Sequence, residues 1–184
     1  PQDTSSAASD VYKRQTNAHL LRYDSVHGKF PSSVKVDGSN IDVGNGPIKV
    51  ISTRDPKELP WKDLDVDIAM ECTGIFTSKE KASMHLEAGA KRVLVSAPTN
   101  GADLTVVYGV NHNKLTNEHL VVSNASCTTN CLAPIAMALN NGVGITQGFM
   151  TTIHSYTGDQ PTLDTMHSDL YRARAAAGNM IPTS

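Results

Sequence analysis

Strand-like and helix-like segments alternate along the middle of this chain, and this alternation restricts the fold more than any other feature. A helix that begins after Ser78 and ends near Gly89 lies between two apolar runs. The order strand, helix, strand predicts an α/β fold with a doubly wound, mostly parallel sheet and right-handed crossovers. Strands are expected at Val66–Cys72, Arg92–Ser96, Thr105–Tyr108 and His119–Ser123.

Smaller elements are expected upstream of these strands. Asn17–Arg22 has the pattern of the end of a helix, and Ile48–Ser52 that of a strand. Gly44-Asn45-Gly46 lies between short β-like runs and predicts a hairpin turn rather than a phosphate-binding loop. The alternating apolar residues of the expected hairpin are Phe30, Val34, Val36, Ile41 and Val43.

The pattern predicts a cysteine at a helix N-terminus, where a thiol is reactive. The run Ser123–Cys131 predicts a strand, a tight turn that carries Cys127, and a helix over Thr128–Asn140. Unpaired backbone N–H groups and the dipole at a helix N-terminus favour the thiolate over the thiol. A second strand over Ile145–Ile153 would place His154 at its end, so that the cysteine and the histidine meet.

The loops at the carboxyl ends of three strands are expected to converge on one crevice. Thr73-Gly74, Ser96-Ala97 and Ser126-Cys127 all follow expected parallel strands. Open α/β sheets bind their ligands at this edge. The crevice is therefore the expected ligand site.

Composition indicates an ordinary globular protein. The chain has 184 residues, a formal charge of −2, 39% hydrophobic and 18% charged residues, so neither nucleic acid nor a membrane is expected as a partner. With no signal-peptide pattern, a cytoplasmic protein is expected. Three cysteines form no even framework, and buried packing is expected for Cys72 and Cys131. No metal site is expected, since the Cys127–Cys131 spacing has no second pair at ligand spacing.

The block Ser123–Cys131, with His-Ser-Tyr-Thr-Gly-Asp-Gln at residues 154–160, resembles the phosphorylating glyceraldehyde-3-phosphate dehydrogenases of bacterial type. The resemblance runs from about Asn17 to Ser184. It implies a Rossmann-type dinucleotide-binding sheet that lacks its first βαβ segment, followed by the start of an α+β catalytic domain. The supporting segments are residues 23–28, 54–56, 72–76, 96–98 and 172–177.

The resemblance also implies a domain organisation. Residues 16–126 would form part of the dinucleotide-binding domain, and residues 127–184 the start of the catalytic domain with its S-shaped loop. Residues 1–15 match no feature of the family and are interpreted as a non-native junction. The chain would be a central fragment, and the complete protein a homotetramer.

The implied reaction is NAD-dependent oxidation of glyceraldehyde 3-phosphate, with inorganic phosphate, to 1,3-bisphosphoglycerate. Cys127 would attack the aldehyde and carry a thioester, and His154 would pair with the thiolate and accept a proton. The two anions would be bound by Ser126, Thr128, Thr157 and Arg172, with Asp159 as an orienting residue. For Arg174, a salt bridge or a tetramer contact is at least as good an interpretation as phosphate binding, so Arg174 is not assigned to the site.

The cofactor implied by the resemblance is NAD, with NADP left open because the acidic residue that decides between them is not in the sequence. The matching positions that would shape the cofactor groove are Arg54, Thr73, Gly74, Phe76 and Ser96.

Three other interpretations stay open. Erythrose-4-phosphate dehydrogenase shares the cysteine block, although Ser96-Ala97-Pro98 and Tyr156-Thr157-Gly158 resemble the triose enzyme better. A thiol hydrolase would also use a cysteine and a histidine, but it leaves Arg54 and the α/β pattern unexplained. A non-catalytic module is expected for the 184-residue chain itself, because half of the cofactor site would be missing.

Overall fold

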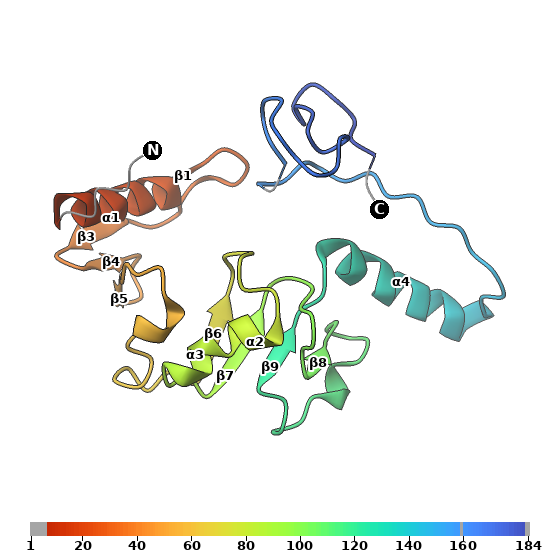
Figure 1. Ribbon diagram of the computed structural model, residues 1–184, viewed down its shortest axis with the longest axis horizontal. Coiled ribbons are helices and arrows are strands. Elements are labelled where there is room, and N and C mark those ends of the chain that lie inside the picture. The colour runs from red at the N-terminus through yellow and green to blue at the C-terminus, as the bar shows by residue number, and fades with distance from the viewer. Residues whose placement is uncertain (1–6, 159, 183–184) are drawn as a thin grey trace. The chain divides into compact units, whose positions relative to one another are not determined.

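A computed structural model describes residues 7–158 and 160–182 of the chain (Figure 1). The chain divides into two compact units, Pro1–Ala133 and Pro134–Ser184. The longer helices are α1 (Ala7–Arg22) and α4 (Cys127–Val143), and the short ones are η1 (Pro56–Glu58), α2 (Lys79–Ala82), α3 (Met84–Glu87) and η2 (His112–Lys114). The strands are β1 (Tyr23–Asp24), β2 (Gly28–Lys29), β3 (Lys35–Asp37), β4 (Asn40–Asp42), β5 (Pro47–Lys49), β6 (Ile68–Glu71), β7 (Arg92–Val95), β8 (Leu104–Thr105) and β9 (Val121–Ser123).

The centre of the first unit is a four-stranded sheet in the order β6-β7-β9-β8. All three strand pairs in it are parallel. The predicted α/β fold with a parallel sheet is confirmed. Because the strands run in one direction, their carboxyl ends lie at a single edge, as the sequence led us to expect.

One face of this sheet is covered by α2 and α3. Ala82 of α2 packs with Val93, Val95 and Val121, which are all almost completely buried. Ser78 caps α2 as predicted, since its side chain accepts a hydrogen bond from the Lys81 amide.

The helix expected from Ser78 to Ala88 is interrupted at Ser83. The Ser83 Oγ donates to the Lys79 carbonyl oxygen at 2.7 Å, and side-chain bonds of this kind compete with the helical ladder. Gly89 follows α3 with a φ of 107°, a conformation that favours glycine. It therefore ends the segment as predicted.

The opposite face of the sheet is open in the described residues, so the expectation that Val66–Cys72 is mostly buried was wrong: four of its seven residues are exposed. Side chains alternate between the faces of a strand. Ala69 and Glu71 are buried, whereas Ile68 and Met70 are 56% and 67% exposed. The helices α2 and α3 cover only the first pair, and a cleft of about 510 Å³ lies over the open face.

Antiparallel hairpins precede the sheet. Strand β4 pairs with β3 and with β5, and Ile41 is opposite both Val36 and Ile48. The predicted turn at Gly44-Asn45-Gly46 joins β4 to β5, and both glycines have a φ of 102°. Ala18 of α1 packs against Val34 and Ile41, so α1 and the hairpins share a small core.

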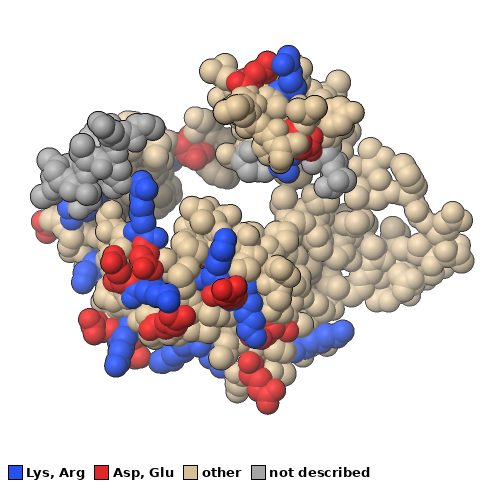
Figure 2. Space-filling view, in the orientation of Figure 1, with Lys and Arg blue, Asp and Glu red and all other residues tan. Residues whose placement is uncertain are grey.

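Helix α4 is 17 residues long and carries no charged side chain. In the space-filling view it forms a surface without Lys, Arg, Asp or Glu, while acidic and basic side chains alternate over the first unit (Figure 2). It begins one residue before, and ends three residues after, the predicted Thr128–Asn140, and it contains Gly142, which was expected to end it. Among the described helices, none is long and apolar enough to cross a membrane.

The strand expected over Ile145–Ile153 is absent from the structure. These residues are irregular, and Phe149 and Ile153 are 97% and 100% exposed. A strand needs a neighbour to pair its backbone N–H and C=O groups, and the described residues provide none here. The expectation was therefore wrong for this chain, and His154 lies in an irregular segment.

The second unit continues from α4 into loops that are held by side-chain contacts. Asp164 accepts a hydrogen bond from the Ala175 amide and pairs with the Arg174 guanidinium at 2.8 Å. Backbone bonds join Thr165 to Ala173 and Ala176 to Pro161. The salt-bridge interpretation of Arg174 is thus confirmed.

Candidate active site

The segments that follow β7 and β9 are joined at the carboxyl edge of the sheet. The Asn124 amide donates to the Val95 carbonyl oxygen at 2.9 Å. The Ser123 hydroxyl, which is fully buried, donates to the Ala97 carbonyl oxygen at 2.8 Å. These bonds hold the predicted Ser96-Ala97 and Ser126-Cys127 segments next to each other.

The turn between β9 and α4 presents Cys127 at the start of the helix. Ala125 has a φ of 57°, a left-handed conformation that costs an alanine about 1–2 kcal/mol. The Ser126 hydroxyl accepts a hydrogen bond from the Thr129 amide at 3.0 Å, which makes Ser126 the N-cap of α4. Cys127 is the first helical residue and is exposed. Its sulfur therefore lies where the helix dipole favours an anion.

Asn130 makes this turn rigid from inside the helix. Its side-chain amide donates to the Asn124 carbonyl oxygen at 2.7 Å and to the Ser126 carbonyl oxygen at 2.9 Å. The first of these bonds spans the strained Ala125, and the second holds the residue that follows it. Backbone strain of this kind persists only where surrounding contacts determine the conformation, and it is typical of active sites.

A cleft of about 500 Å³ opens beside the turn. This volume is in the range of small-molecule sites. None of the described residues that line it is acidic, and their hydroxyl and amide groups can donate to an anion or a carboxamide. The polar lining residues are Thr77, Thr99, Asn100, Thr105, Ser126 and Thr129.

The predicted cofactor residues of the first unit lie on loops. Thr73 and Gly74 follow β6 and are exposed, and Gly74 has a φ of 74°, with open space where a side chain would begin. Ser96 is exposed after β7. Phe76 is half-buried, and Arg54 is exposed between β5 and η1. Contact of these residues with a dinucleotide stays a proposal.

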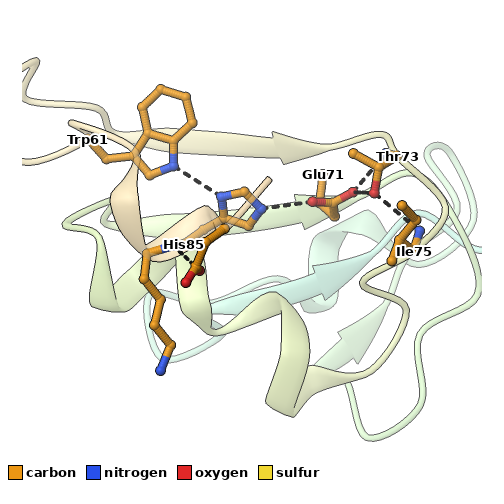
Figure 3. A network of polar contacts seen from close by, with 7 residues as sticks. Trp61, Glu71, Thr73, Ile75 and His85 are labelled. Atoms are coloured by element: carbon orange, nitrogen blue, oxygen red, sulfur yellow. Dashed lines mark hydrogen bonds and ion pairs between the residues drawn. The ribbon is translucent and has the colours of Figure 1, made fainter. Parts of the chain in front are cut away.

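A buried polar network lies behind the Thr73 loop (Figure 3). His85 Nε2 is 2.8 Å from the Glu71 Oε2, and the Trp61 indole N–H donates to His85 Nδ1 at 3.0 Å. The Glu71 Oε1 accepts a hydrogen bond from the Thr73 amide at 2.7 Å. An indole nitrogen only donates, so Nδ1 carries no proton and Nε2–H donates to the carboxylate.

This network holds Glu71 ionised although the side chain is only 3% exposed. Burial alone raises the pKa of Glu71, but hydrogen bonds from the Thr73 hydroxyl, from His85 and from the Thr73 amide outweigh it, so the pKa lies below its ordinary value. Sequence analysis missed Glu71. A carboxylate inside the apolar run Ile68–Cys72 was the available signal.

The remaining predicted site residues belong to α4 and the second unit. Thr128 is half-buried in the first turn of α4. His154 and Thr157 are exposed, and the His154 Nδ1 donates to the Ser155 carbonyl oxygen at 2.5 Å. Arg172 is half-buried, and Asp159 lies outside the described residues. The pairing of His154 with Cys127, which belongs to the other unit, stays a proposal.

The expectation of buried packing was wrong for two cysteines. Cys72 and Cys131 are both exposed. Cys72 follows the last residue of β6, and α4 buries none of its residues. The reason is the same in each case: the described residues do not cover the apolar surface around these side chains.

Comparisons with known proteins find similarity to the same kind of protein over most of the chain. The sequence model of the glyceraldehyde 3-phosphate dehydrogenase NAD binding domain matches residues 5–79, and that of the C-terminal domain matches residues 126–184. The first match takes in residues 5–15, for which no resemblance was expected. The second begins at the N-cap of α4.

Curated relatives show the same similarity. A glyceraldehyde-3-phosphate dehydrogenase of Xanthobacter flavus is 75% identical over 178 residues, and one of Cereibacter sphaeroides is 69% identical over the same length. The glyceraldehyde-3-phosphate dehydrogenase 1 of Bacillus subtilis is 54% identical over 179 residues. Each alignment covers 97% of this chain and 53% of the relative. The chain thus spans about half the length of the curated relatives it matches.

Proposed function

Because this chain belongs to the glyceraldehyde 3-phosphate dehydrogenase family, we propose that the whole protein oxidises glyceraldehyde 3-phosphate with NAD and inorganic phosphate to 1,3-bisphosphoglycerate, as in glycolysis. The observation that carries this proposal is the placement of Cys127. The Ser126-capped turn presents the sulfur as the first residue of a long helix, at the carboxyl edge of a parallel sheet.

Cys127 is the nucleophile in this proposal. Its thiolate attacks the aldehyde carbon, a C–S bond forms as the C=O π bond breaks, and the carbonyl oxygen takes a proton from the His154 imidazolium to become the hydroxyl of a hemithioacetal. His154 accepts the hydroxyl proton as a hydride leaves the same carbon, which gives a thioester on the sulfur. A phosphate oxygen then attacks the thioester carbon, the C–S bond breaks, and the thiolate is regenerated.

Binding of the two anions is assigned to neutral donors and one cation. Ser126 is the N-cap of α4 and Thr128 lies in its first turn, where backbone N–H groups also favour an anion. Thr157 and Arg172 of the second unit complete the proposed set, and the planar guanidinium suits phosphate oxygens. Asp159 is proposed as an orienting residue, because its carboxylate would repel phosphate.

The described residues fit a nicotinamide dinucleotide. The open glycine turn at Gly74 and the cleft, whose described lining residues include no acidic side chain, both admit an anionic ligand at the sheet edge. Thr73, Gly74, Phe76 and Ser96 would hold it, with Arg54 toward the adenine. When bound, the nicotinamide accepts the hydride. The match to an NAD binding domain supports NAD as the cofactor.

The proposal also covers the domain organisation and the subunit assembly of the whole protein. Residues 16–126 form part of the dinucleotide-binding domain, and residues 127–184 begin the catalytic domain; the second match, from residue 126, supports this boundary. We further propose a cytoplasmic homotetramer for the whole protein. Light scattering tests the assembly: four subunits per particle are expected, and a stable active monomer contradicts it.

Activity is tested on the full-length protein. NADH formation, followed at 340 nm, should require glyceraldehyde 3-phosphate, NAD and phosphate together. Erythrose 4-phosphate serves as the competing aldehyde, and a higher kcat/KM for it would overturn the assignment of the substrate. Absence of NADH formation with either aldehyde would overturn the proposed function.

A further inference from the structure

Glu71 joins the interior of the first unit to the loop that the proposed function assigns to the cofactor. It is the last residue of β6, and its two carboxylate oxygens have different partners. Oε1 accepts from the amide and the hydroxyl of Thr73, whereas Oε2 accepts from His85. The Thr73 hydroxyl in turn accepts from the Ile75 amide at 3.1 Å. The carboxylate therefore holds Thr73 directly and Ile75 through the Thr73 hydroxyl.

His85 supports both ends of this loop. Its ring is 6% exposed, and the Trp61 indole holds its Nδ1. The His85 ring also lies against the edge of Phe76, with ring centroids 6.4 Å apart and planes at 80°. A single imidazole from α3 thus contacts Glu71 before the loop and Phe76 after it.

We propose that Glu71 is a positioning residue that holds the Thr73–Phe76 loop in the conformation that binds the dinucleotide, with His85 and Trp61 holding Glu71 in turn. This inference rests on the proposed function, because it takes the loop to contact the cofactor. Glu71 itself touches no reacting atom.

The physical argument concerns the cost of ordering a loop. Thr73, Gly74 and Ile75 are exposed, and Gly74 gives the backbone additional freedom. Without fixed partners such a loop would lose conformational entropy when the ligand binds. A buried, ionised carboxylate that accepts backbone and hydroxyl bonds orders the loop before binding, and preorganisation of this kind increases affinity.

The test uses the full-length protein with NAD as the probe. Glu71→Gln keeps the shape of the side chain but leaves only one acceptor oxygen for Thr73 and His85. Thr73→Val removes the hydroxyl at an exposed position, where folding is not at risk, and Thr73→Ser restores it. Glu80→Gln, an exposed change on α2, is the control. Calorimetry gives the Kd for NAD, and hydrogen exchange of the loop amides reports its order without activity.

We expect Glu71→Gln and Thr73→Val to raise the Kd by about tenfold and to accelerate exchange of the loop amides, since each loses a hydrogen bond to a charged group. Glu80→Gln should resemble the wild type in both measurements, and Thr73→Ser should restore the slow exchange of the loop amides. A folded Glu71→Gln variant with wild-type affinity and exchange would overturn the inference alone. If that variant does not fold, wild-type behaviour of Thr73→Val overturns it. A wild type that does not bind NAD overturns the proposed function as well.

Discussion

The Ser126 hydroxyl accepts a hydrogen bond from the Thr129 amide and lies 2.7 Å from the Thr129 hydroxyl. This pair closes the N-terminus of α4 around Cys127, which stands between them as the first helical residue. Local bonds between residues 126 and 129 thereby secure the shape of the turn. The stability of the turn and the reactivity of the thiol should therefore respond differently to changes at Ser126.

Ser126→Ala removes the N-cap and should lower the free energy of unfolding by about 1 kcal/mol. Ser126→Asp keeps a capping oxygen and should retain stability, but its carboxylate disfavours the neighbouring thiolate. Urea unfolding and the rate of alkylation of Cys127 at pH 7 measure the two effects. Equal alkylation rates in the wild type and Ser126→Asp would contradict the proposed electrostatic environment.

Ala125 provides a test of backbone strain. Ala125→Gly relieves the left-handed strain but adds freedom to the unfolded chain and removes a buried methyl, so we expect a change within about 1 kcal/mol. Ala125→Val places a β-branched residue at a φ of 57° and should destabilise by about 2 kcal/mol or more. Urea unfolding compares the three proteins. A valine variant as stable as the glycine variant would show that the turn is not strained.

The contacts of Asp103 predict that the free energy of unfolding depends on pH. Its carboxylate accepts from Lys79 Nζ and from the amides of Val121 and Leu120, and these bonds, that of Lys79 foremost, lower the pKa of Asp103. A lowered pKa in the folded state stabilises the fold above the pKa of the unfolded chain, and this contribution is lost as the pH falls through the folded value.

Asp103→Asn should therefore cost about 2 kcal/mol at pH 7 and progressively less below about pH 4. The measurement is urea unfolding of the wild type and the variant across that range. Asp63→Asn, at an exposed position, is the matched control and should cost little at any pH. A cost for Asp103→Asn that stays constant down to pH 2 would contradict the assignment.

Local signals predicted the parts of the fold that depend on neighbours in sequence. Ser78 and Gly89 begin and end their helical segment, and Gly44-Asn45-Gly46 makes its turn, because capping bonds and positive φ angles are set by a few adjacent residues. The convergence of strand ends followed from the strand–helix–strand order alone.

Features that depend on distant partners were not predictable. The apolar run Ile145–Ile153 has the composition of a strand, but a strand forms only when another one pairs with it. Burial of Cys131 likewise depends on what covers α4. The bond between Glu71 and His85 joins residues on different elements, and the sequence places a histidine on a helix without indicating which carboxylate it meets.

The central claim is that the Cys127 sulfur carries the chemistry, and alkylation of the full-length protein tests it most directly. Iodoacetamide modification is followed by mass spectrometry of the Cys127 and Cys131 peptides, in parallel with NADH formation from glyceraldehyde 3-phosphate. We expect activity to fall in proportion to alkylation of Cys127, and Cys131→Ser to stay active and remain sensitive to the reagent. Full activity in protein whose Cys127 is completely alkylated would contradict the account.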